Sequence, residues 1–204
     1  AYEEGWVGNT RLAFIGDTLS TQGEKVPELF IVGLPTDEQG WKCAGDAPLQ
    51  GTPETMPAPP AGVMQRRLTF THQNRYPGLV NVPRHWVRSN PQGTQLAFLM
   101  RDDNGIVQLW LISPEGGEPR QLTRHDSGIQ SAFNWHPSGN MLGFVLENRI
   151  ALCDAQSGKI LFLTEAHASP PSADAIVFSP DGKRLAWMEE VDGYRQLWVT
   201  QTGR

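Results

Sequence analysis

Residues 176–187, with the sequence IVFSPDGKRLAW, decide the fold, because their pattern occurs three times in the chain. Each copy is centred on a Pro-x-Gly turn, and the prolines Pro91, Pro137 and Pro180 lie 46 and 43 residues apart. Proline sets the backbone angle of an early turn position, and glycine supplies the positive angle that ends the turn. Self-similarity at such a period is typical of propellers and solenoids.

Alternating apolar residues flank each turn, which is the pattern of a β-hairpin. They stand four residues before the proline and five and seven residues after it: Val87, Leu96 and Phe98; Phe133, Leu142 and Phe144; Ile176, Leu185 and Trp187. A third strand is expected at residues 107–112, 149–154 and 194–200, and a fourth strand ends in Leu-Thr at residues 122–123 and 163–164. The sequence therefore predicts an all-β protein, a β-propeller of four-stranded antiparallel blades with almost no helix.

Four blades are expected, at about residues 6–69, 84–123, 131–164 and 174–204. The last blade lacks its outer strand. No Pro-x-Gly turn precedes Arg11, so the first strand of blade 1 is expected to be missing or degenerate. Open sheet edges favour aggregation. We therefore expect half of a larger ring, completed by the missing half of the propeller or by another chain. A self-contained four-bladed ring is the alternative.

The repeat resembles that of TolB-type propellers, a family whose pattern continues into the Gln-Leu-Trp triplets at residues 108–110 and 196–198. More closely, the chain resembles the C-terminal half of the enterobacterial YidR-type proteins, through residues 1–9, 82–87 and 98–112. This resemblance implies the propeller fold and a ring about twice this length. It also implies a loosely described role in adherence and biofilm, but no reaction.

Composition narrows the possible partners of the 204-residue chain. It has 17 Lys and Arg against 22 Asp and Glu, a net charge of −5, which disfavours binding to nucleic acid by charge. No apolar run approaches the roughly 20 residues that a membrane span needs, and the first residues lack the order of a secretory signal. Cys43 is expected in a loop and Cys153 in the core. Two cysteines leave both a disulfide and the cellular compartment open.

No catalytic motif stands out from the repeat. The nucleophile elbow Gly-x-Ser-x-Gly is absent, and Ser138 and Ser157 lie in hairpin turns. The histidines form no His-x-x-x-His spacing, and the cysteines form no Cys-x-x-Cys motif. We therefore expect no catalytic residue, no metal site and no cofactor. The alternative is a propeller enzyme, either a metal-dependent lactonase or hydrolase or a lid on a separate hydrolase domain.

Loops that leave the fourth and second strands share one face of a propeller. That face is expected to gather histidines, carboxylates and a distinctive loop at residues 70–78 around the mouth of the channel. The candidate ligand-binding residues are His72, Arg75, Tyr76, Arg84, His85, Arg101, Asp102, Asp103, His125, Glu147, His167 and Glu189. Trp86 is expected in the blade core, whereas His136 belongs to a turn on the opposite face.

A Pro-rich insertion at residues 35–63 interrupts blade 1 between its third and fourth strands. It is expected to be an irregular loop, and Trp41 is the candidate anchor if this loop contacts a neighbour. Together these patterns favour a non-catalytic scaffold or binding module. Its loop face and channel mouth would hold a protein, a peptide, a small molecule or a cation.

Overall fold

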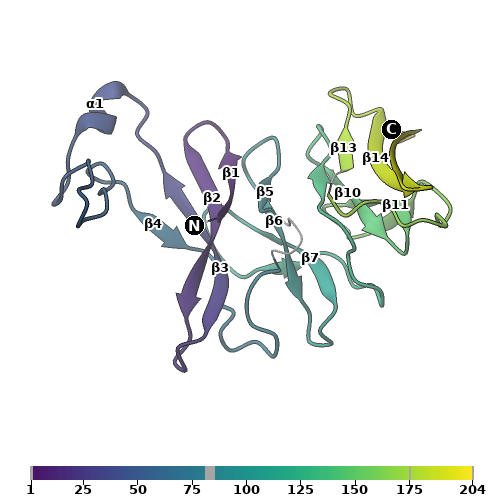
Figure 1. Cartoon of the computed structure of the whole chain (residues 1–204), viewed down its shortest axis with the longest axis horizontal. Coiled ribbons are helices and arrows are strands. Elements are labelled where there is room, and N and C mark those ends of the chain that lie inside the picture. Colours follow the sequence, from purple (N-terminus) through teal and green to yellow (C-terminus); the bar gives the residue numbers. More distant parts are fainter. Residues whose placement is uncertain (1, 81–85, 175, 204) are drawn as a thin grey trace.

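The computed structural model describes residues 2–80, 86–174 and 176–203, which form four antiparallel sheets in succession (Figure 1). Each sheet is one blade, and its strands lie in chain order. Blade 1 contains β1 (Tyr2–Val7), β2 (Arg11–Leu19), β3 (Lys25–Gly33) and β4 (Gln65–Arg67); blade 2 contains β5 (Arg88–Ser89), β6 (Leu96–Arg101), β7 (Val107–Ile112) and β8 (Arg120–Gln121). Blade 3 contains β9 (Asn134–Trp135), β10 (Met141–Leu146), β11 (Arg149–Asp154) and β12 (Ile160–Phe162); blade 4 contains β13 (Ile176–Phe178), β14 (Arg184–Val191) and β15 (Tyr194–Gln201). The predicted all-β fold is confirmed.

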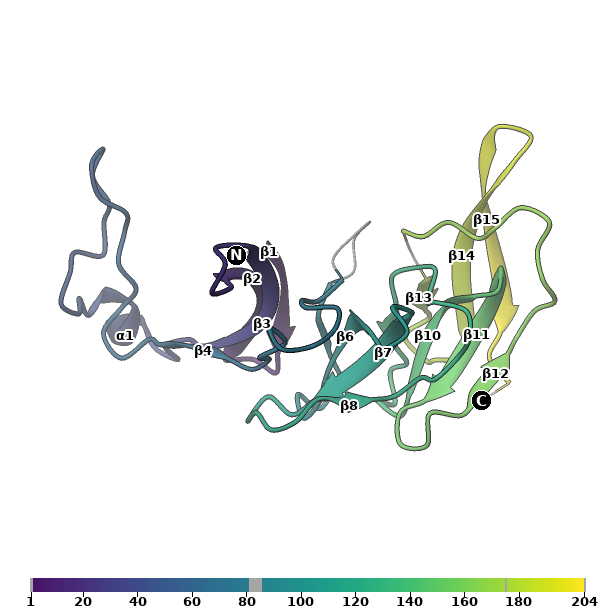
Figure 2. The ribbon, with the colours of Figure 1, turned by 90° about the horizontal axis from the view of Figure 1, so that it is seen from below.

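The first strands of the blades form the inner side of an arc. β1 contacts β5, β5 contacts β9, and β9 contacts β13, so successive blades are joined at their inner strands. Within the described residues no comparable contact returns from β13 to β1, and Figure 1 shows blades 1 and 4 at opposite ends. Turning the molecule shows the same open arc (Figure 2). The alternative of a self-contained four-bladed ring is therefore wrong.

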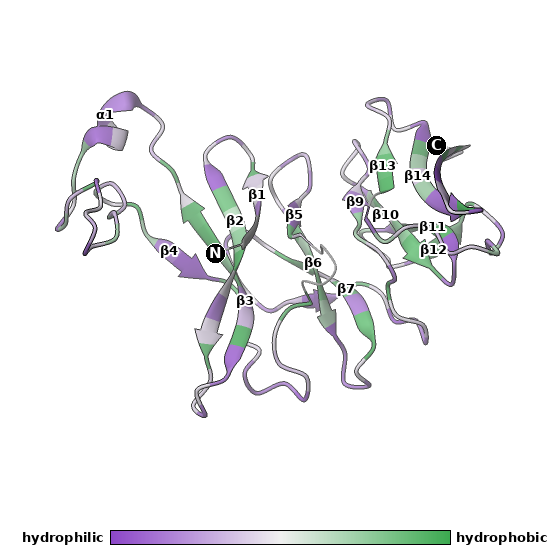
Figure 3. Cartoon of the chain, viewed as in Figure 1, coloured by the Kyte–Doolittle hydropathy of each residue, from purple (hydrophilic) through white to green (hydrophobic). Residues whose placement is uncertain are grey.

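Three apolar clusters fill the spaces between blades. One joins blades 1 and 2, the next joins blades 2 and 3, and the third joins blades 3 and 4. All six residues of β10 are buried, because this strand has a blade against each of its faces. The apolar stripes along the strands are visible in Figure 3. Burial of a Leu or Phe side chain contributes roughly 1.5–3 kcal/mol, so packing between blades is the main source of stability.

The three Pro-x-Gly turns occupy equivalent hairpins, as predicted. Gly93, Gly139 and Gly182 have φ angles of 68°, 76° and 72°, which residues with a side chain rarely adopt. Each glycine N–H donates to the carbonyl three residues earlier, at 2.8–2.9 Å. Successive turns also touch: a Cβ on Gly182 would lie 2.2 Å from His136 Nε2 of the preceding blade. The glycines therefore serve both the turn and the contact between blades.

His136 is a turn residue that also links blades 3 and 4. Its Nδ1 lies 2.8 Å from Ser138 Oγ, and its Nε2 lies 3.1 Å from the Gly182 carbonyl oxygen. The ring packs edge-on against Phe178 of blade 4. The predicted position of His136 in a turn is confirmed.

Blade 1 is complete, contrary to the expectation of a missing or degenerate first strand. β1 pairs with β2 along Trp6↔Leu12 and Val7↔Arg11. Its hairpin turns through Gly8, which has a φ of 61°. The turn contains no proline, so the Pro-x-Gly pattern missed it.

The insertion in blade 1 contains α1 (Glu38–Lys42), the only helix among the described residues. Asp37 caps it by accepting a hydrogen bond from Gly40 N at 2.7 Å. A bridge between Ala44 and Pro60 closes the rest of the insertion. Trp41 is 48% exposed, so it is accessible to a neighbour, and its role as an anchor stays a prediction. Among the residues that the structure describes, none form a helix with the length and apolar character of a membrane span.

Candidate functional site

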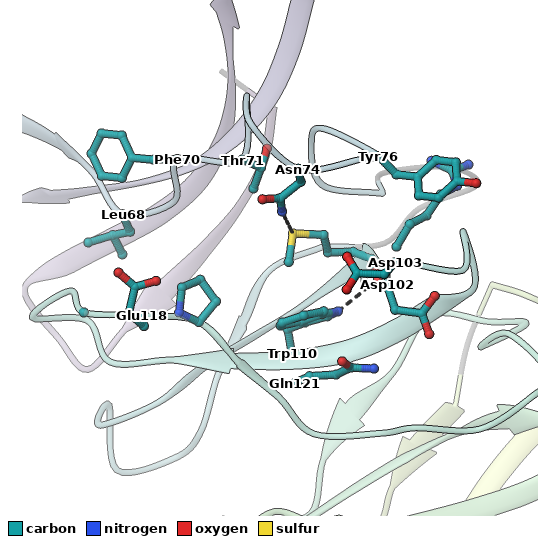
Figure 4. A pocket seen from close by; sticks show the side chains of 14 residues that line it. Leu68, Phe70, Thr71, Asn74, Tyr76, Asp102, Asp103, Trp110, Glu118 and Gln121 are labelled. Atoms are coloured by element: carbon teal, nitrogen blue, oxygen red, sulfur yellow. Dashed lines mark hydrogen bonds between the residues drawn. The ribbon is translucent and has the colours of Figure 1, made fainter.

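A pocket of about 350 Å³ lies between blades 1 and 2 (Figure 4). We call it the inter-blade pocket. One wall comes from the segment that follows β4, and the other comes from β6, β7, β8 and the turns that join them. It is lined by Leu68, Phe70, Thr71, Asn74, Tyr76, Met100, Arg101, Asp102, Asp103, Trp110, Gly117, Glu118, Pro119 and Gln121. None of the lining residues belongs to the inner strands β1 and β5.

Aromatic rings form much of the pocket wall. The indole of Trp110 is held by a hydrogen bond from Nε1 to the Met100 carbonyl oxygen at 3.0 Å. Phe70 is 62% exposed and Tyr76 is half-buried. Arg67 lies 4.6 Å above the centre of the Phe70 ring, and Arg75 lies 5.6 Å from that of Tyr76. These contacts are within the range of cation–π attraction, so the rings already accept cationic neighbours.

Two of the three carboxylates in the pocket are available for a ligand. Asp102 is committed to the β6–β7 turn, where Oδ1 accepts the N–H groups of Asn104 and Ile106 at 2.9 and 3.0 Å. Asp103 and Glu118 are exposed and make no side-chain hydrogen bond or ion pair with the described residues. Figure 4 shows these two solvent-exposed carboxylates on either side of Trp110.

A buried carboxylate holds the long loop between β4 and β5 in place. Glu28 is fully buried and pairs with Arg67 at 2.7 Å. It also accepts hydrogen bonds from the Thr71 N–H and hydroxyl, at 2.7 and 2.9 Å, and from the Thr69 hydroxyl. A buried carboxylate requires such partners. Glu28 therefore positions the wall that carries Phe70 and Tyr76, a role that sequence reasoning missed.

The structure brings together four of the predicted site residues, namely Tyr76, Arg101, Asp102 and Asp103, in the inter-blade pocket. Arg75 lies beside them, and its Nη1 donates to the Asp103 carbonyl oxygen at 3.3 Å. His72 is exposed on the same loop. Arg84 and His85 lie outside the described residues.

The remaining candidates form two separate pairs at later blade junctions. His125 Nε2 lies 3.9 Å from Glu147 Oε1, between blades 2 and 3. His167 Nδ1 lies 2.7 Å from the buried Glu189 carboxylate, which also accepts a hydrogen bond from Trp187 Nε1 at 2.6 Å. These His–carboxylate pairs do not join the pocket, and their role in ligand binding stays a prediction.

Trp86 lies on the channel side, so its predicted place in the blade core is wrong. It is 39% exposed and lines a hollow of about 280 Å³ on the inner strands, together with Trp6 and Arg88. Val87 is the core residue, at 1% exposed. Trp86 and Val87 directly precede β5, and only Val87 belongs to the apolar cluster between blades 1 and 2. Burial lowers the pKa of Arg88, whose guanidinium lies 5.2 Å from the Trp86 ring centre.

The cysteines are both free, and no group of three His, Cys, Asp or Glu side chains within the described ranges could hold a metal ion. Cys43 is exposed in the insertion, and Cys153 is buried in the core, as expected from the sequence. Burial and the neighbouring Asp154 raise the pKa of the Cys153 thiol to about 12. Cys153 is therefore protonated at neutral pH.

Comparisons with known proteins identify the fold. The chain aligns with TolB from Acinetobacter baumannii over 95% of its length, with a TM-score of 0.60 and 18% identity, and covers 38% of that protein. A TolB-like protein from Agrobacterium tumefaciens gives a TM-score of 0.54 and 18% identity over 93% of this chain and 58% of its own. The fold is that of a TolB-type β-propeller. At these identities the likeness concerns the fold alone.

The sequence itself matches a protein of Escherichia coli. The chain is 76% identical over its whole length to the uncharacterized protein YidR, and it covers 48% of that protein. The resemblance to YidR-type proteins is therefore confirmed, and the chain spans about half the length of this relative. No family model matches the chain.

Proposed function

We propose that the chain is a non-catalytic β-propeller binding module whose ligand site is the inter-blade pocket. The observation that carries the proposal is the convergence of aromatic rings and unpaired carboxylates in one 350 Å³ pocket. Phe70 and Trp110 offer apolar surface, while Asp103 and Glu118 offer acceptors. Pockets of this size with a few convergent polar groups are typical of ligand sites. A role in adherence or biofilm rests on the sequence resemblance alone and forms no part of the proposal.

The chemistry of the pocket favours a ligand that combines a flat apolar group with a cationic donor. A ring can pack on Phe70 or Trp110, and an amidinium, guanidinium or ammonium group can donate to Glu118 or Asp103. Hydrogen bonds to charged groups are stronger than neutral ones. Small molecules and peptide side chains both provide this combination.

Benzamidine tests the proposal, because it joins a phenyl ring to a cationic donor. We expect saturation-transfer NMR to detect its binding, with a dissociation constant of about 1 mM for so small a ligand. Replacing Glu118→Gln or Asp103→Asn should weaken binding by about threefold to tenfold, since each removes a charged acceptor.

Two controls make the experiment specific. Benzoate keeps the ring but reverses the charge, so it should bind much more weakly than benzamidine. Glu165→Gln removes an exposed carboxylate from the β12–β13 loop and should leave benzamidine binding unchanged. Absence of benzamidine binding, or binding unaffected by both pocket variants, contradicts the proposed site.

We also propose that the partner of the chain is the rest of a longer propeller. The relative YidR is about twice as long as the chain, and the four blades leave an open arc. In blade 4 the side chains of Val177, Leu197 and Val199 are 51%, 70% and 57% exposed on one face. Exposed apolar faces of this kind are suited to contact with a further blade.

A further inference from the structure

The Leu-Thr sequence that ends each outer strand makes the same hydrogen bond in three blades. A residue in the third strand donates its backbone N–H to the threonine hydroxyl, at 2.8 Å for Leu29 and Thr69 and at 2.9 Å for Leu109 and Thr123. In blade 3, Ile150 N donates to Thr164 Oγ1 at 3.1 Å. The hydroxyl thus replaces a backbone acceptor at the end of the ladder.

In blades 1 and 2 the threonine is also recognised by a side chain. The Thr123 hydroxyl donates to Gln108 Oε1 at 2.7 Å, and the Thr69 hydroxyl donates to a Glu28 carboxylate oxygen. All four of these residues are fully buried. A hydroxyl that both accepts and donates in a buried site selects threonine or serine over an apolar residue.

The leucine of each Leu-Thr pair contributes an apolar contact beside the hydrogen bonds of the threonine. Leu68 and Leu122 are each 3% exposed and belong to the clusters that join their blade to the next. An outer strand is therefore recognised by two adjacent side chains as well as by its backbone. The leucine packs in the space between blades, and the threonine hydroxyl accepts a hydrogen bond from a backbone N–H of the third strand.

Blade 4 has the receiving half of this contact without the outer strand. Its triplet Gln196-Leu197-Trp198 repeats Gln108-Leu109-Trp110 of blade 2, and Leu197 pairs with Met188 as Leu109 pairs with Leu99. Leu109 and Gln108 are fully buried, whereas Leu197 is 70% exposed and Gln196 is also exposed. By this equivalence the N–H of Leu197 faces the open edge of β15.

We propose that the open edge of β15 binds an outer strand that carries Leu-Thr and is supplied by polypeptide outside these 204 residues. The threonine hydroxyl accepts the Leu197 N–H and donates to Gln196 Oε1, while the leucine covers the Leu197 side chain. The chain contains Leu-Thr only at residues 68–69, 122–123 and 163–164, and each of these already serves its own blade. A second copy would have to give up one of its own outer strands.

This inference rests on the proposal that the propeller continues beyond the chain, and it is independent of the inter-blade pocket. The test supplies the strand directly. The chain is extended after Arg204 by a flexible Gly/Ser linker and the sequence EPRQLTR, copied from residues 118–124. A linker raises the effective concentration of the added strand. Exchange of the Leu197 amide hydrogen is then followed by NMR.

We expect the extension to slow exchange at Leu197 by at least about tenfold relative to the chain without it. With Leu-Val in place of the added Leu-Thr, the Leu197 amide should exchange about tenfold faster than with Leu-Thr. The acceptor for the Leu197 N–H and the donor to Gln196 are then lost together. Gln196→Leu should reduce the protection of the Leu197 amide by the Leu-Thr extension, and it should leave the protection by the Leu-Val extension unchanged. Gln201→Leu, at the far end of β15, is the matched control and should change neither.

Each contrary result overturns the proposal. Equal protection by the Leu-Thr and Leu-Val extensions means that any strand suffices. No protection by either extension, in a chain whose circular dichroism is unchanged, means that β15 does not take an outer strand. A dimer of the unextended chain with Leu197 already protected assigns the edge to a second copy instead. The design leaves Asp103 and Glu118 intact, so its failure does not bear on the benzamidine test.

Discussion

Blades 2 and 4 carry nearly the same repeat but bury different amounts of it. In blade 2, Leu109 is fully buried, because β8 lies along one edge and blade 3 covers one face. In blade 4 the equivalent Leu197 is 70% exposed, although β14 and β15 pair over eight positions. Strand pairing is therefore a property of the hairpin, whereas burial comes from the neighbouring blade and the outer strand.

Truncation of the two equivalent leucines tests this difference most strongly. Leu109→Ala leaves a cavity between blades 2 and 3 and should lower the free energy of unfolding by about 3–4 kcal/mol. Leu197→Ala removes a side chain that is mostly in solvent and should cost less than about 0.5 kcal/mol. Urea unfolding monitored by circular dichroism measures both values.

The comparison fails if the two substitutions cost the same amount. A large loss in Leu197→Ala would mean that another part of the molecule covers β15 in solution. Exposed Leu161→Ala, at 44% exposure in β12, is a control for the loss of a partly exposed leucine elsewhere in the arc.

The glycines that follow the third strands give the next largest contrast. Gly158 in blade 3 and Gly203 in blade 4 have φ angles of 74° and 70°. A Cβ on Gly158 would lie 2.3 Å from the Leu122 carbonyl oxygen of blade 2, whereas one on Gly203 would meet nothing within 4 Å. We expect Gly158→Ala to cost about 2–3 kcal/mol, since it adds a clash to backbone strain, and Gly203→Ala about 1 kcal/mol.

Thermal unfolding by calorimetry distinguishes the two glycine variants. Gly193→Ala is a useful reference, because Gly193 also has a positive φ, of 78°, with open space around it. If Gly158→Ala and Gly193→Ala lose the same amount of unfolding free energy, the expected difference is contradicted, because backbone strain alone would then account for both losses.

The smallest expected effect concerns the buried thiol of blade 3. Burial raises the pKa of Cys153 to about 12, while an unfolded thiol titrates near pH 8.5. The unfolded state therefore loses a proton first as the pH rises, so the stabilisation due to the buried thiol is present below about pH 8.5 and falls toward pH 12. From about pH 8 to 9.5 this loss should be about 1 kcal/mol.

Cys153→Ala isolates that dependence from other alkaline titrations. The difference in unfolding free energy between the natural chain and the variant should shrink as the pH rises. A difference that stays constant with pH contradicts the raised pKa. Exposed Cys43 should react with a thiol reagent in the folded chain, and Cys153 should react only on unfolding.

The fold could be predicted from the sequence because its determinants are local. Pro-x-Gly turns and alternating residues on both sides of them specify a hairpin without knowledge of the rest of the chain. The first strand escaped prediction because its turn at Gly8 uses no proline. Val87 is buried, as its place in the apolar pattern predicts, but Trp86 was wrongly expected in the core, because its large apolar side chain gave no sign that it would be 39% exposed.

The candidate site was only partly accessible to sequence reasoning. Tyr76, Asp102 and Asp103 were found, since loop residues on one face of a propeller lie near one another. Trp110 and Glu118 were not, because they belong to β7 and to the turn before β8, and not to the loops considered for the site. Nothing in the sequence around Glu28 indicates that it would hold the loop of the neighbouring wall, since its partners lie about 40 residues away.

The contacts between successive inner turns have a consequence for the curvature of the arc. Each turn glycine packs closely against the preceding blade: Gly93 against the Gly8 backbone, Gly139 against Gln92, and Gly182 against His136. Neighbouring blades approach closely at these turns because glycine has no side chain. A Cβ on Gly93 would lie 3.1 Å from the Gly8 backbone nitrogen, so a methyl group at Gly93 would press blades 1 and 2 apart at their inner ends, whereas a Cβ on Gly8 itself would meet nothing within 4 Å. Glycines at the hairpin turns therefore allow close approach of neighbouring blades, and this approach affects the angle between blades and the number of blades in a complete ring.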